Sequence, residues 1–309
     1  MIRFQLILAL LALSFSAKAQ DITHRPGLLV MAHGGSEEWN EAVLDAVMPL
    51  TAHHPVAVAF GMANPETLQE AADELVDSGV SEIHVVRLFI SGDSFLAETE
   101  YAFSLSDQAP DGHYMHEPRP INLSVPVSLS SEGLMDIVSL GGVLKDRAKV
   151  LSMHPRSESV FIIGHGPGSD EENERWLQRM DRMADSVRAV LPFHSVQVET
   201  LREDWTGKRE EAEERIRTHI QKEVQAGRTV LVIPFRLHGF GPYAEVLEGL
   251  DYRSDGMGFL PDSRITDWIK FQFDQLVSTQ DLQTGVYLKT PLENHLPATR
   301  LPDTINHDH

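Results

Sequence analysis

The protein has 309 residues, with 26 Lys and Arg against 46 Asp and Glu, so its formal net charge is −20. This acid excess argues against a nucleic-acid binder, because binding to phosphates needs a basic face. The chain has no cysteine, which excludes disulfides, thiolate metal sites and cysteine nucleophiles. Its 15 histidines are therefore the main candidates for soft metal ligands.

The first 19 residues have the features of a secretory signal peptide. Arg3 gives a positive start, residues 4–15 are almost wholly apolar, and Ala17-Lys18-Ala19 has the small-x-small form of a cleavage site. The apolar run of about a dozen residues is shorter than the roughly 20 that a membrane-spanning helix needs. We expect cleavage after Ala19, a periplasmic or secreted protein and no stable membrane insertion. An N-terminal anchor helix is the alternative.

The chain contains one motif twice. An apolar run at 27–32 (GLLVMA) ends in His33-Gly34-Gly35-Ser36, and a second at 159–164 (SVFIIG) ends in His165-Gly166-Pro167-Gly168-Ser169. In both copies, acidic residues and an Asn-Glu pair follow the serine. Self-similarity of this kind indicates two related halves. We expect the boundaries to be 1–19 for the signal peptide, 20–153 for the N-terminal half, 154–280 for the C-terminal half and 281–309 for a tail that contains Pro and His.

Strands and helices alternate within each half. In the first half we predict strands at 27–32, 56–60 and 82–90, a helix that ends near residue 50 and a helix that begins at Asn64-Pro65 and ends near residue 78. We also predict a loop or lid at 107–126 and a helix at 130–150. In the second half we predict strands at 159–164, 195–199 and 229–234, and helices ending near residues 190 and 226. The alternation indicates an α/β fold with a mainly parallel sheet flanked by helices in each half, and a cleft between the halves.

His33 and His165 directly follow the first strand of each half. Sites in parallel α/β sheets form at the carboxyl ends of strands, and the glycines after each histidine allow the backbone to turn there. An imidazole in this place can bind a divalent metal or act as a general base. The alternative is that each histidine only hydrogen-bonds its own turn, which the repetition of the motif disfavours.

Further donors follow the other strands of the second half. Glu199 closes the second strand, and His238 follows the third. If these strands are parallel neighbours, we expect both side chains to lie beside His165, and two imidazoles with one carboxylate suit a first-row divalent metal. The alternatives are a solvated Glu199 that pairs with Arg202, and an ordinary loop histidine at 238. The first half lacks equivalent donors.

These segments resemble a known family. The His-Gly-x-Ser strand end, the run from Phe60 to Pro65 before a helix, and the Leu88-Phe89-Ile90-x-Gly segment resemble the class II tetrapyrrole chelatases, in particular the sirohydrochlorin cobaltochelatases. The resemblance covers roughly residues 27–273. It implies a chelatase-like fold of two halves facing a cleft for a flat macrocycle that carries several carboxylates. A further family histidine falls at Ser94 in the first half and is displaced to His238 in the second.

The resemblance implies a lyase of cobalamin biosynthesis that inserts a divalent metal into a tetrapyrrole. The metal would be Co²⁺ first, with Ni²⁺, Fe²⁺ or Zn²⁺ as alternatives. The catalytic residues would be His165 and Glu199, the metal ligands His33, His165, Glu199 and His238, and the substrate contacts Ser36, Ser94, Ser169 and Arg236. Positive charge for the substrate carboxylates would come from Arg87, Arg202, Arg236 and Arg253.

Export from the cytoplasm leaves two other functions open. Tetrapyrrole synthesis is expected in the cytoplasm, so one alternative is a non-catalytic periplasmic protein that binds a metal or a tetrapyrrole. The other is an exported α/β protein with an unrelated ligand. The sequence does not decide whether the protein forms a homo-oligomer.

Overall fold

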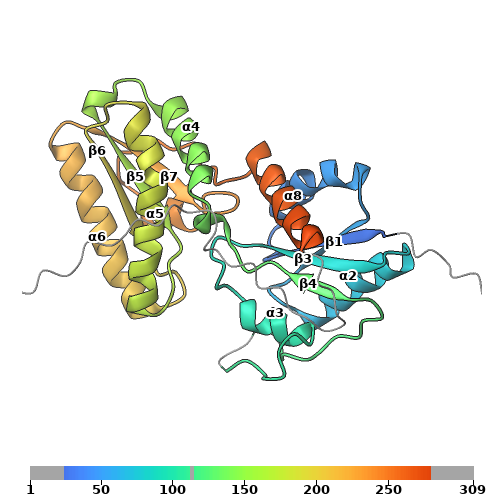
Figure 1. Ribbon diagram of the computed structural model, residues 1–309. Coiled ribbons are helices and arrows are strands. Elements are labelled where there is room, and N and C mark those ends of the chain that lie inside the picture. The colour runs from blue at the N-terminus through green and yellow to red at the C-terminus, as the bar shows by residue number, and fades with distance from the viewer. Residues whose placement is uncertain (1–23, 112–114, 280–309) are drawn as a thin grey trace, which may run out of the picture.

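The computed structural model describes residues 24–111 and 115–279, so the predicted signal peptide and tail lie outside the described chain (Figure 1). The described residues form two α/β halves, each with a parallel sheet flanked by helices, as the sequence predicts. Within these residues, no helix combines the length and hydropathy that crossing a membrane requires.

The sheet of the first half has four parallel strands. These are β1 (Pro26–Ala32), β2 (Val56–Phe60), β3 (Glu82–Leu88) and β4 (Val127–Leu129), in the spatial order β2-β1-β3-β4. β3 is buried along its whole length and β1 from its second residue, as expected for central strands that are covered on both faces. The two central strands therefore end beside each other, where His33 begins the loop after β1.

Side-chain caps begin the first two helices of this half, α1 (Glu37–Val47) and α2 (Pro65–Asp77). Asn64 accepts a hydrogen bond from the backbone N–H of Glu66 at 2.9 Å, and Pro65 occupies the first helical position. A short 3₁₀ helix, η1 (Met48–Ala52), continues α1. Two short elements of this half, β4 and α3 (Leu96–Ala102), were not predicted from the sequence.

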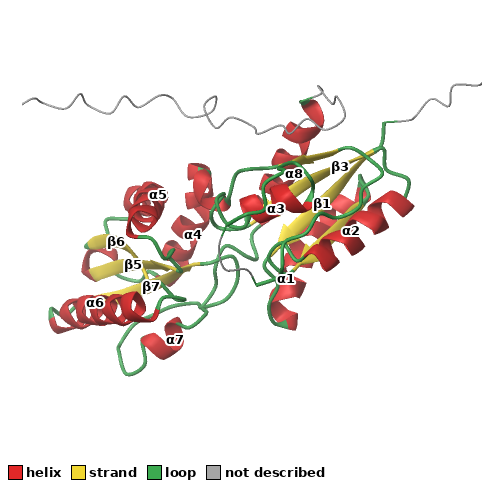
Figure 2. Ribbon diagram, turned by 90° about the horizontal axis from the view of Figure 1, so that it is seen from below, coloured by secondary structure: helices red, strands yellow, loops and turns green. Residues whose placement is uncertain are grey.

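The sheet of the second half is built from β5 (Glu158–Gly164), β6 (Ser195–Thr200) and β7 (Thr229–Phe235), all parallel and in the order β6-β5-β7. Each strand lies within a residue or so of its predicted bounds. Figure 2 shows α5 (Asp170–Val190) and α6 (Thr206–Gln225) on opposite faces of this sheet. A short helix, α7 (Tyr243–Val246), follows β7.

Two helices are exchanged between the halves (Figure 1). α4 (Gly141–Leu151) comes from the first part of the chain but packs against α5 and β7 of the second half. α8 (Ser263–Ser278) comes from the last part but packs against β3 and α1 of the first half. The halves are therefore not the continuous segments 20–153 and 154–280 that the sequence analysis expected, because each contains a helix from the other segment.

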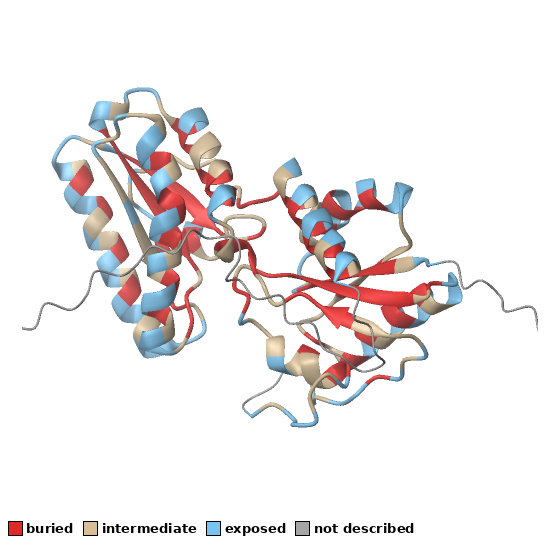
Figure 3. Cartoon of the chain, in the orientation of Figure 1, coloured by how far each residue is buried: buried red, intermediate tan, exposed pale blue. Residues whose placement is uncertain are grey.

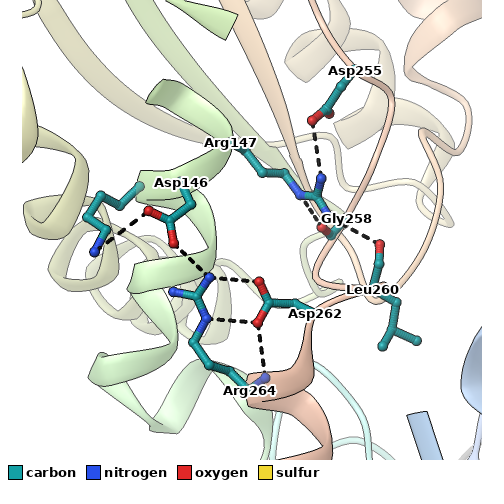
Figure 4. A network of polar contacts seen from close by, with 8 residues as sticks. Asp146, Arg147, Asp255, Gly258, Leu260, Asp262 and Arg264 are labelled. Carbon is teal, nitrogen blue, oxygen red and sulfur yellow. Dashed lines mark hydrogen bonds and ion pairs between the residues drawn. The ribbon is translucent and has the colours of Figure 1, made fainter. Parts of the chain in front are cut away.

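A polar network joins the two exchanged helices (Figure 4). Arg264, at the start of α8, donates to both oxygens of Asp262 and to Asp146 on α4 at 2.8 Å. Arg147 on α4 donates to the carbonyl oxygens of Gly258 at 2.6 Å and Leu260 at 3.2 Å. These contacts hold residues 258–264, the segment that leads from the second half to α8, against α4.

The prediction of a helix at 130–150 is wrong for residues 130–140, because α4 begins only at Gly141. After β4 the chain makes two 3₁₀ turns, η2 (Leu134–Asp136) and η3 (Val138–Leu140), before α4 begins. Gly92 and Gly133 touch through their backbones, since a Cβ on Gly133 would lie 2.3 Å from the amide nitrogen of Gly92. The segment carries the chain from one sheet to the other, which a straight helix would not do.

The two halves share one core (Figure 3). The largest cluster of buried apolar side chains contains residues from both sheets, including Leu28 and Val30 of β1 and Val160 and Ile162 of β5. Two smaller clusters fill the outer faces of the sheets, one under α2 and one under α6. The shared core fixes the loops at the strand ends relative to one another, because protein interiors are close-packed.

Candidate functional site

The two His-Gly turns have the same geometry. Nδ1 of His33 lies 2.7 Å from the carbonyl oxygen of Gly34, and Nδ1 of His165 lies 2.7 Å from that of Gly166. Because a carbonyl can only accept, Nδ1 carries the proton in both rings. Nε2 then faces away from the backbone, and it is the ring nitrogen that could bind a metal. Both glycines have positive φ angles, of 82° and 77°, which allow this turn.

The serine of each motif caps the helix that follows. Ser36 Oγ accepts from the N–H of Trp39 at 3.3 Å at the start of α1, and Ser169 Oγ accepts from the N–H of Glu172 at 3.1 Å at the start of α5. Acidic residues fill the first turn of both helices, where the helix dipole favours them. Each hydroxyl still has its proton to donate, and a contact of Ser36 or Ser169 with substrate stays a prediction.

His165 lies beside two carboxylates that the sequence analysis missed. Its Nε2 is 3.1 Å from Oδ2 of Asp204 and 3.9 Å from Oε2 of Glu203. Two ligands that bind one ion at about 2.1 Å lie about 3.0 to 3.4 Å apart at octahedral or tetrahedral angles. The distance from His165 to Asp204 therefore suits two neighbouring ligands of one ion.

Arg202 holds the loops that carry these three side chains. It is 5% exposed, and its backbone N–H donates to the carbonyl of His165 at 2.7 Å. Its guanidinium donates to the carbonyl oxygens of Pro167 and Gly168 and to Asp170 at 3.0 Å. With its hydrogen-bonding groups committed to the loop, Arg202 does not provide the free positive charge that the sequence analysis expected.

Glu199 does not lie beside His165, as the sequence had predicted. Its carboxylate accepts from the N–H of Thr200 at 3.0 Å and pairs with Arg215 on α6 at 3.4 Å. Strand β6 continues to Thr200, and the chain turns back at Arg202, which has a φ angle of 58°. This turn brings the residues after the strand to His165, in place of the predicted Glu199.

Glu203 is also bound to a half-buried basic group. Arg236, at the end of β7, pairs with Oε1 of Glu203, and its guanidinium carbon lies 5.7 Å from the centroid of the Tyr243 ring. Burial raises the pKa of Tyr243 far above its ordinary value, so the phenol stays neutral. Arg236 therefore binds one oxygen of Glu203, while Oε2 of Glu203 faces His165.

His238 is turned toward the other half. Its Nε2 lies 4.0 Å from Oε1 of Glu38 at the start of α1, and its buried Nδ1 has no hydrogen-bond partner in the described chain. Within residues 24–111 and 115–279, no group of three or more His, Asp or Glu side chains is placed to hold a metal ion. The structure therefore does not assemble the predicted ligand set of His165, Glu199 and His238.

The equivalent place in the first half has fewer donors. His33 is exposed, and none of the described carboxylates pairs with it. The carbonyl of Ser94 accepts from the buried Arg87 at 2.6 Å, and Arg87 also donates to the carbonyls of Gly92 and Ser130. Arg87 thus binds its loop as Arg202 does in the second half. A contact between Ser94 and substrate stays a prediction.

Arg253 lies at the opposite end of the second sheet. It donates to the carbonyl of Leu151 at 2.7 Å and pairs with Glu158, the first residue of β5. Of the four arginines considered for substrate carboxylates, only Arg236 reaches the carboxylates beside His165. Its hydrogen bond to Glu203 uses one guanidinium nitrogen, Nη1.

Comparison with known proteins bears on the fold. No protein-family model and no curated protein matches the chain. Among solved structures, it is similar to the sirohydrochlorin chelatase SirB from Bacillus subtilis subspecies spizizenii in complex with cobalt, at 15% identity and a TM-score of 0.54, over 84% of this chain and 98% of that chain. It is also similar to SirB from Bacillus subtilis with Fe³⁺, at 14% identity and a TM-score of 0.58, over the same shares. The chain therefore has a chelatase-like fold of two α/β halves.

Proposed function

We propose that the protein binds a divalent metal ion at His165 and inserts it into a tetrapyrrole. The observation that carries this proposal is the 3.1 Å distance between Nε2 of His165 and Oδ2 of Asp204 at the carboxyl end of a central parallel strand. The chelatase-like fold supports it, as do the cobalt and Fe³⁺ in the similar SirB structures. Co²⁺ is our first choice of metal, with Ni²⁺, Fe²⁺ or Zn²⁺ as alternatives.

A small ligand set suits an ion that must leave. In insertion the metal is a substrate, and the four ring nitrogens replace the protein ligands. A site with open positions can pass the ion on, whereas a saturated cage would retain it. His165 and Asp204 would hold the ion, while water and the approaching ring would complete its coordination.

Insertion also needs a base, since a divalent ion replaces two pyrrole N–H protons, which must leave the ring. We assign this role to Glu203, whose Oε2 lies 3.9 Å from Nε2 of His165. Arg236 binds the other oxygen of the carboxylate, which fixes its orientation without occupying the oxygen that faces the site. A base held in this way can take one proton at a time from the bound ring.

The substrate class follows from the same proposal. A flat tetrapyrrole with peripheral carboxylates would meet Arg236 and the hydroxyls of Ser36 and Ser169, which can donate hydrogen bonds. Ser94 would contact the tetrapyrrole from the first half. We also propose that the protein works after export, as the N-terminal segment predicts.

The second candidate is a non-catalytic carrier of a metal or a tetrapyrrole in the periplasm. It is favoured by the unequal halves, because His33 has the turn of His165 but none of its described carboxylate partners. A carrier would bind Co²⁺ or a metallated ring without raising the rate of insertion.

The test is the rate of Co²⁺ insertion into sirohydrochlorin without oxygen, followed by the change in ring absorbance. We expect the mature protein to exceed the spontaneous rate, and His165→Ala to lose about 100-fold or more, as removing a catalytic group does. His33→Ala is the matched control, because it removes a histidine that makes the same turn but has none of the described carboxylates beside it. Glu199→Gln is the second control. Both should retain most of the rate.

Three outcomes are informative. A wild-type rate equal to the spontaneous rate excludes the enzyme, and calorimetric titration with Co²⁺ and with the metallated ring then tests the carrier. An active wild-type protein with an equally active His165→Ala variant places the site elsewhere. A loss in Glu199→Gln as large as that in His165→Ala would instead support the ligand set expected from the sequence.

A further inference from the structure

The chain has four tryptophans, and two of them lie beside the motif histidines. Trp176 and Trp268 are buried, with 6% and 4% of their surfaces exposed. Trp205 is 38% exposed, and its ring centroid lies 6.2 Å from that of His165. Trp39 is partly buried, and its ring centroid lies 6.2 Å from that of His33. The more exposed indoles are thus found at the two places where an imidazole presents Nε2.

Each indole packs on the same motif glycine. Gly35 and Gly168 both precede the serine that caps the next helix. A Cβ on Gly35 would lie 3.2 Å from Cγ of Trp39, and a Cβ on Gly168 would lie 2.3 Å from Nε1 of Trp205. The glycine in each copy therefore lets an indole lie against the loop that carries the histidine.

The two indoles do not come from equivalent positions. Trp39 lies in the first turn of α1, whereas Trp205 lies in the loop between β6 and α6. In the second copy the residue corresponding to Trp39 is Glu172. Duplication of an ancestral half does not account for this, because it would reproduce the tryptophan at the same place. The arrangement of imidazole, glycine and indole is instead built twice by different residues, which points to a shared requirement at the two sites.

A flat aromatic ligand meets that requirement. Indole faces and edges bind aromatic rings with an energy beyond simple burial of apolar surface. An alanine substitution for an aromatic residue that stacks on a base typically weakens binding about 5- to 150-fold. A protein with a net charge of −20 gains little long-range attraction for a ring that carries carboxylates. Contact with the ring face supplies affinity that this charge distribution cannot.

We infer that Trp205 holds one face of a planar tetrapyrrole beside His165, and that Trp39 makes the corresponding contact from the first half. The inference rests on the proposed function, and it adds the residues that recognise the ring. His165 and Asp204 bind the ion, while Trp205 and Trp39 bind the ring.

The test is absorbance titration of metal-free uroporphyrin, a porphyrin with eight carboxylates, with the mature protein. We expect Trp205→Ala to raise Kd at least tenfold, Trp39→Ala to raise it less, and Trp205→Phe to stay within about threefold of wild type, because a benzene ring still packs on the macrocycle. Phe271→Ala removes an aromatic side chain of α8 that is 43% exposed, and should leave Kd unchanged. Calorimetry with Co²⁺ alone should give the same affinity for Trp205→Ala and wild type.

Equal uroporphyrin affinities of wild type, Trp205→Ala and Trp39→Ala would overturn the inference and leave the proposed function standing. A Trp205→Ala variant that loses Co²⁺ affinity as strongly as ring affinity would also overturn it, since the indole would then only support the loop of His165. Wild-type protein that binds neither uroporphyrin nor sirohydrochlorin would overturn the inference and the proposed function together.

Discussion

Asp204 places a carboxylate oxygen 3.1 Å from Nε2 of His165, although neither residue lies in a helix or strand. Asp204 follows β6 and His165 follows β5, and these strands are parallel neighbours. Their pairing brings the two loops together at one edge of the sheet, and Arg202 ties the loops to each other.

Asp204→Asn should weaken Co²⁺ binding about tenfold or more, because an amide oxygen is a poorer ligand than a carboxylate for a first-row divalent ion. Asp204 is 69% exposed on its side chain, so the fold should survive the substitution. Calorimetric titration with Co²⁺ measures the effect. Glu199→Gln is the control, and an equal loss in both variants would show that neither carboxylate is a specific ligand.

Arg202→Met should destabilise the protein by about 2–4 kcal/mol, because it leaves the carbonyl oxygens of Pro167 and Gly168 without their charged donor. It should also lower the rate of metal insertion, since the loop of His165 loses its attachment. Urea denaturation gives the free energy of unfolding. Arg215→Met, which removes an exposed partner of Glu199, is the matched control and should cost less than about 1 kcal/mol. Similar losses in the two variants would contradict the role of Arg202.

Acidification should destabilise the first half through His84. Burial under α8 lowers the pKa of His84 below its ordinary 6.5, and the nearby carboxylate of Glu82 only partly offsets this. The unfolded chain then binds more protons than the folded chain, so stability is complete above pH 6.5 and falls as the pH drops below it. The urea midpoint at pH 7.5 and at pH 5.5 measures this effect.

His84→Asn should reduce that pH dependence, because asparagine does not titrate in this range. His154→Asn changes an exposed histidine and should leave the pH dependence as it is in wild type. If His84→Asn and wild type lose stability in parallel between these pH values, another group causes the loss.

Glu223 should protect the second half at lower pH. Hydrogen bonds from Arg228 and Ser159 lower the pKa of Glu223 from 4.5 to about 2. For a carboxylate with a lowered pKa, the stabilisation is complete above 4.5 and is lost as the pH falls toward 2. Glu223→Gln should cost about 1–3 kcal/mol at pH 7 and progressively less at pH 3, as measured by urea unfolding. A cost that does not depend on pH would exclude this origin.

Much of the fold could be predicted because hydrophobic pattern and capping agree along most of the chain. The strands at 56–60 and 159–164 and the helix start at Asn64 follow directly from local residues. The exchange of α4 and α8 could not be predicted in this way, since nothing local to an amphipathic helix specifies which sheet it covers. Such packing depends on the shared core.

The candidate site was predicted in part for a similar reason. His165 and His33 mark strand ends because an apolar run stops at a His-Gly turn. The carboxylate partner depends on where β6 ends and how the chain turns afterwards. One additional strand residue and the positive φ angle of Arg202 exchange Glu199 for Glu203 and Asp204. Two acidic residues, four and five positions after the end of the predicted strand, were the available signal.

The most direct test of the central proposal is a crystal structure of the mature protein with Co²⁺, with anomalous scattering recorded at the cobalt edge. We expect one cobalt ion at about 2.1 Å from both Nε2 of His165 and a carboxylate oxygen of Asp204. Cobalt bound at Glu199, at His238 with Glu38, or at sites that do not include His165 would contradict the proposed metal site.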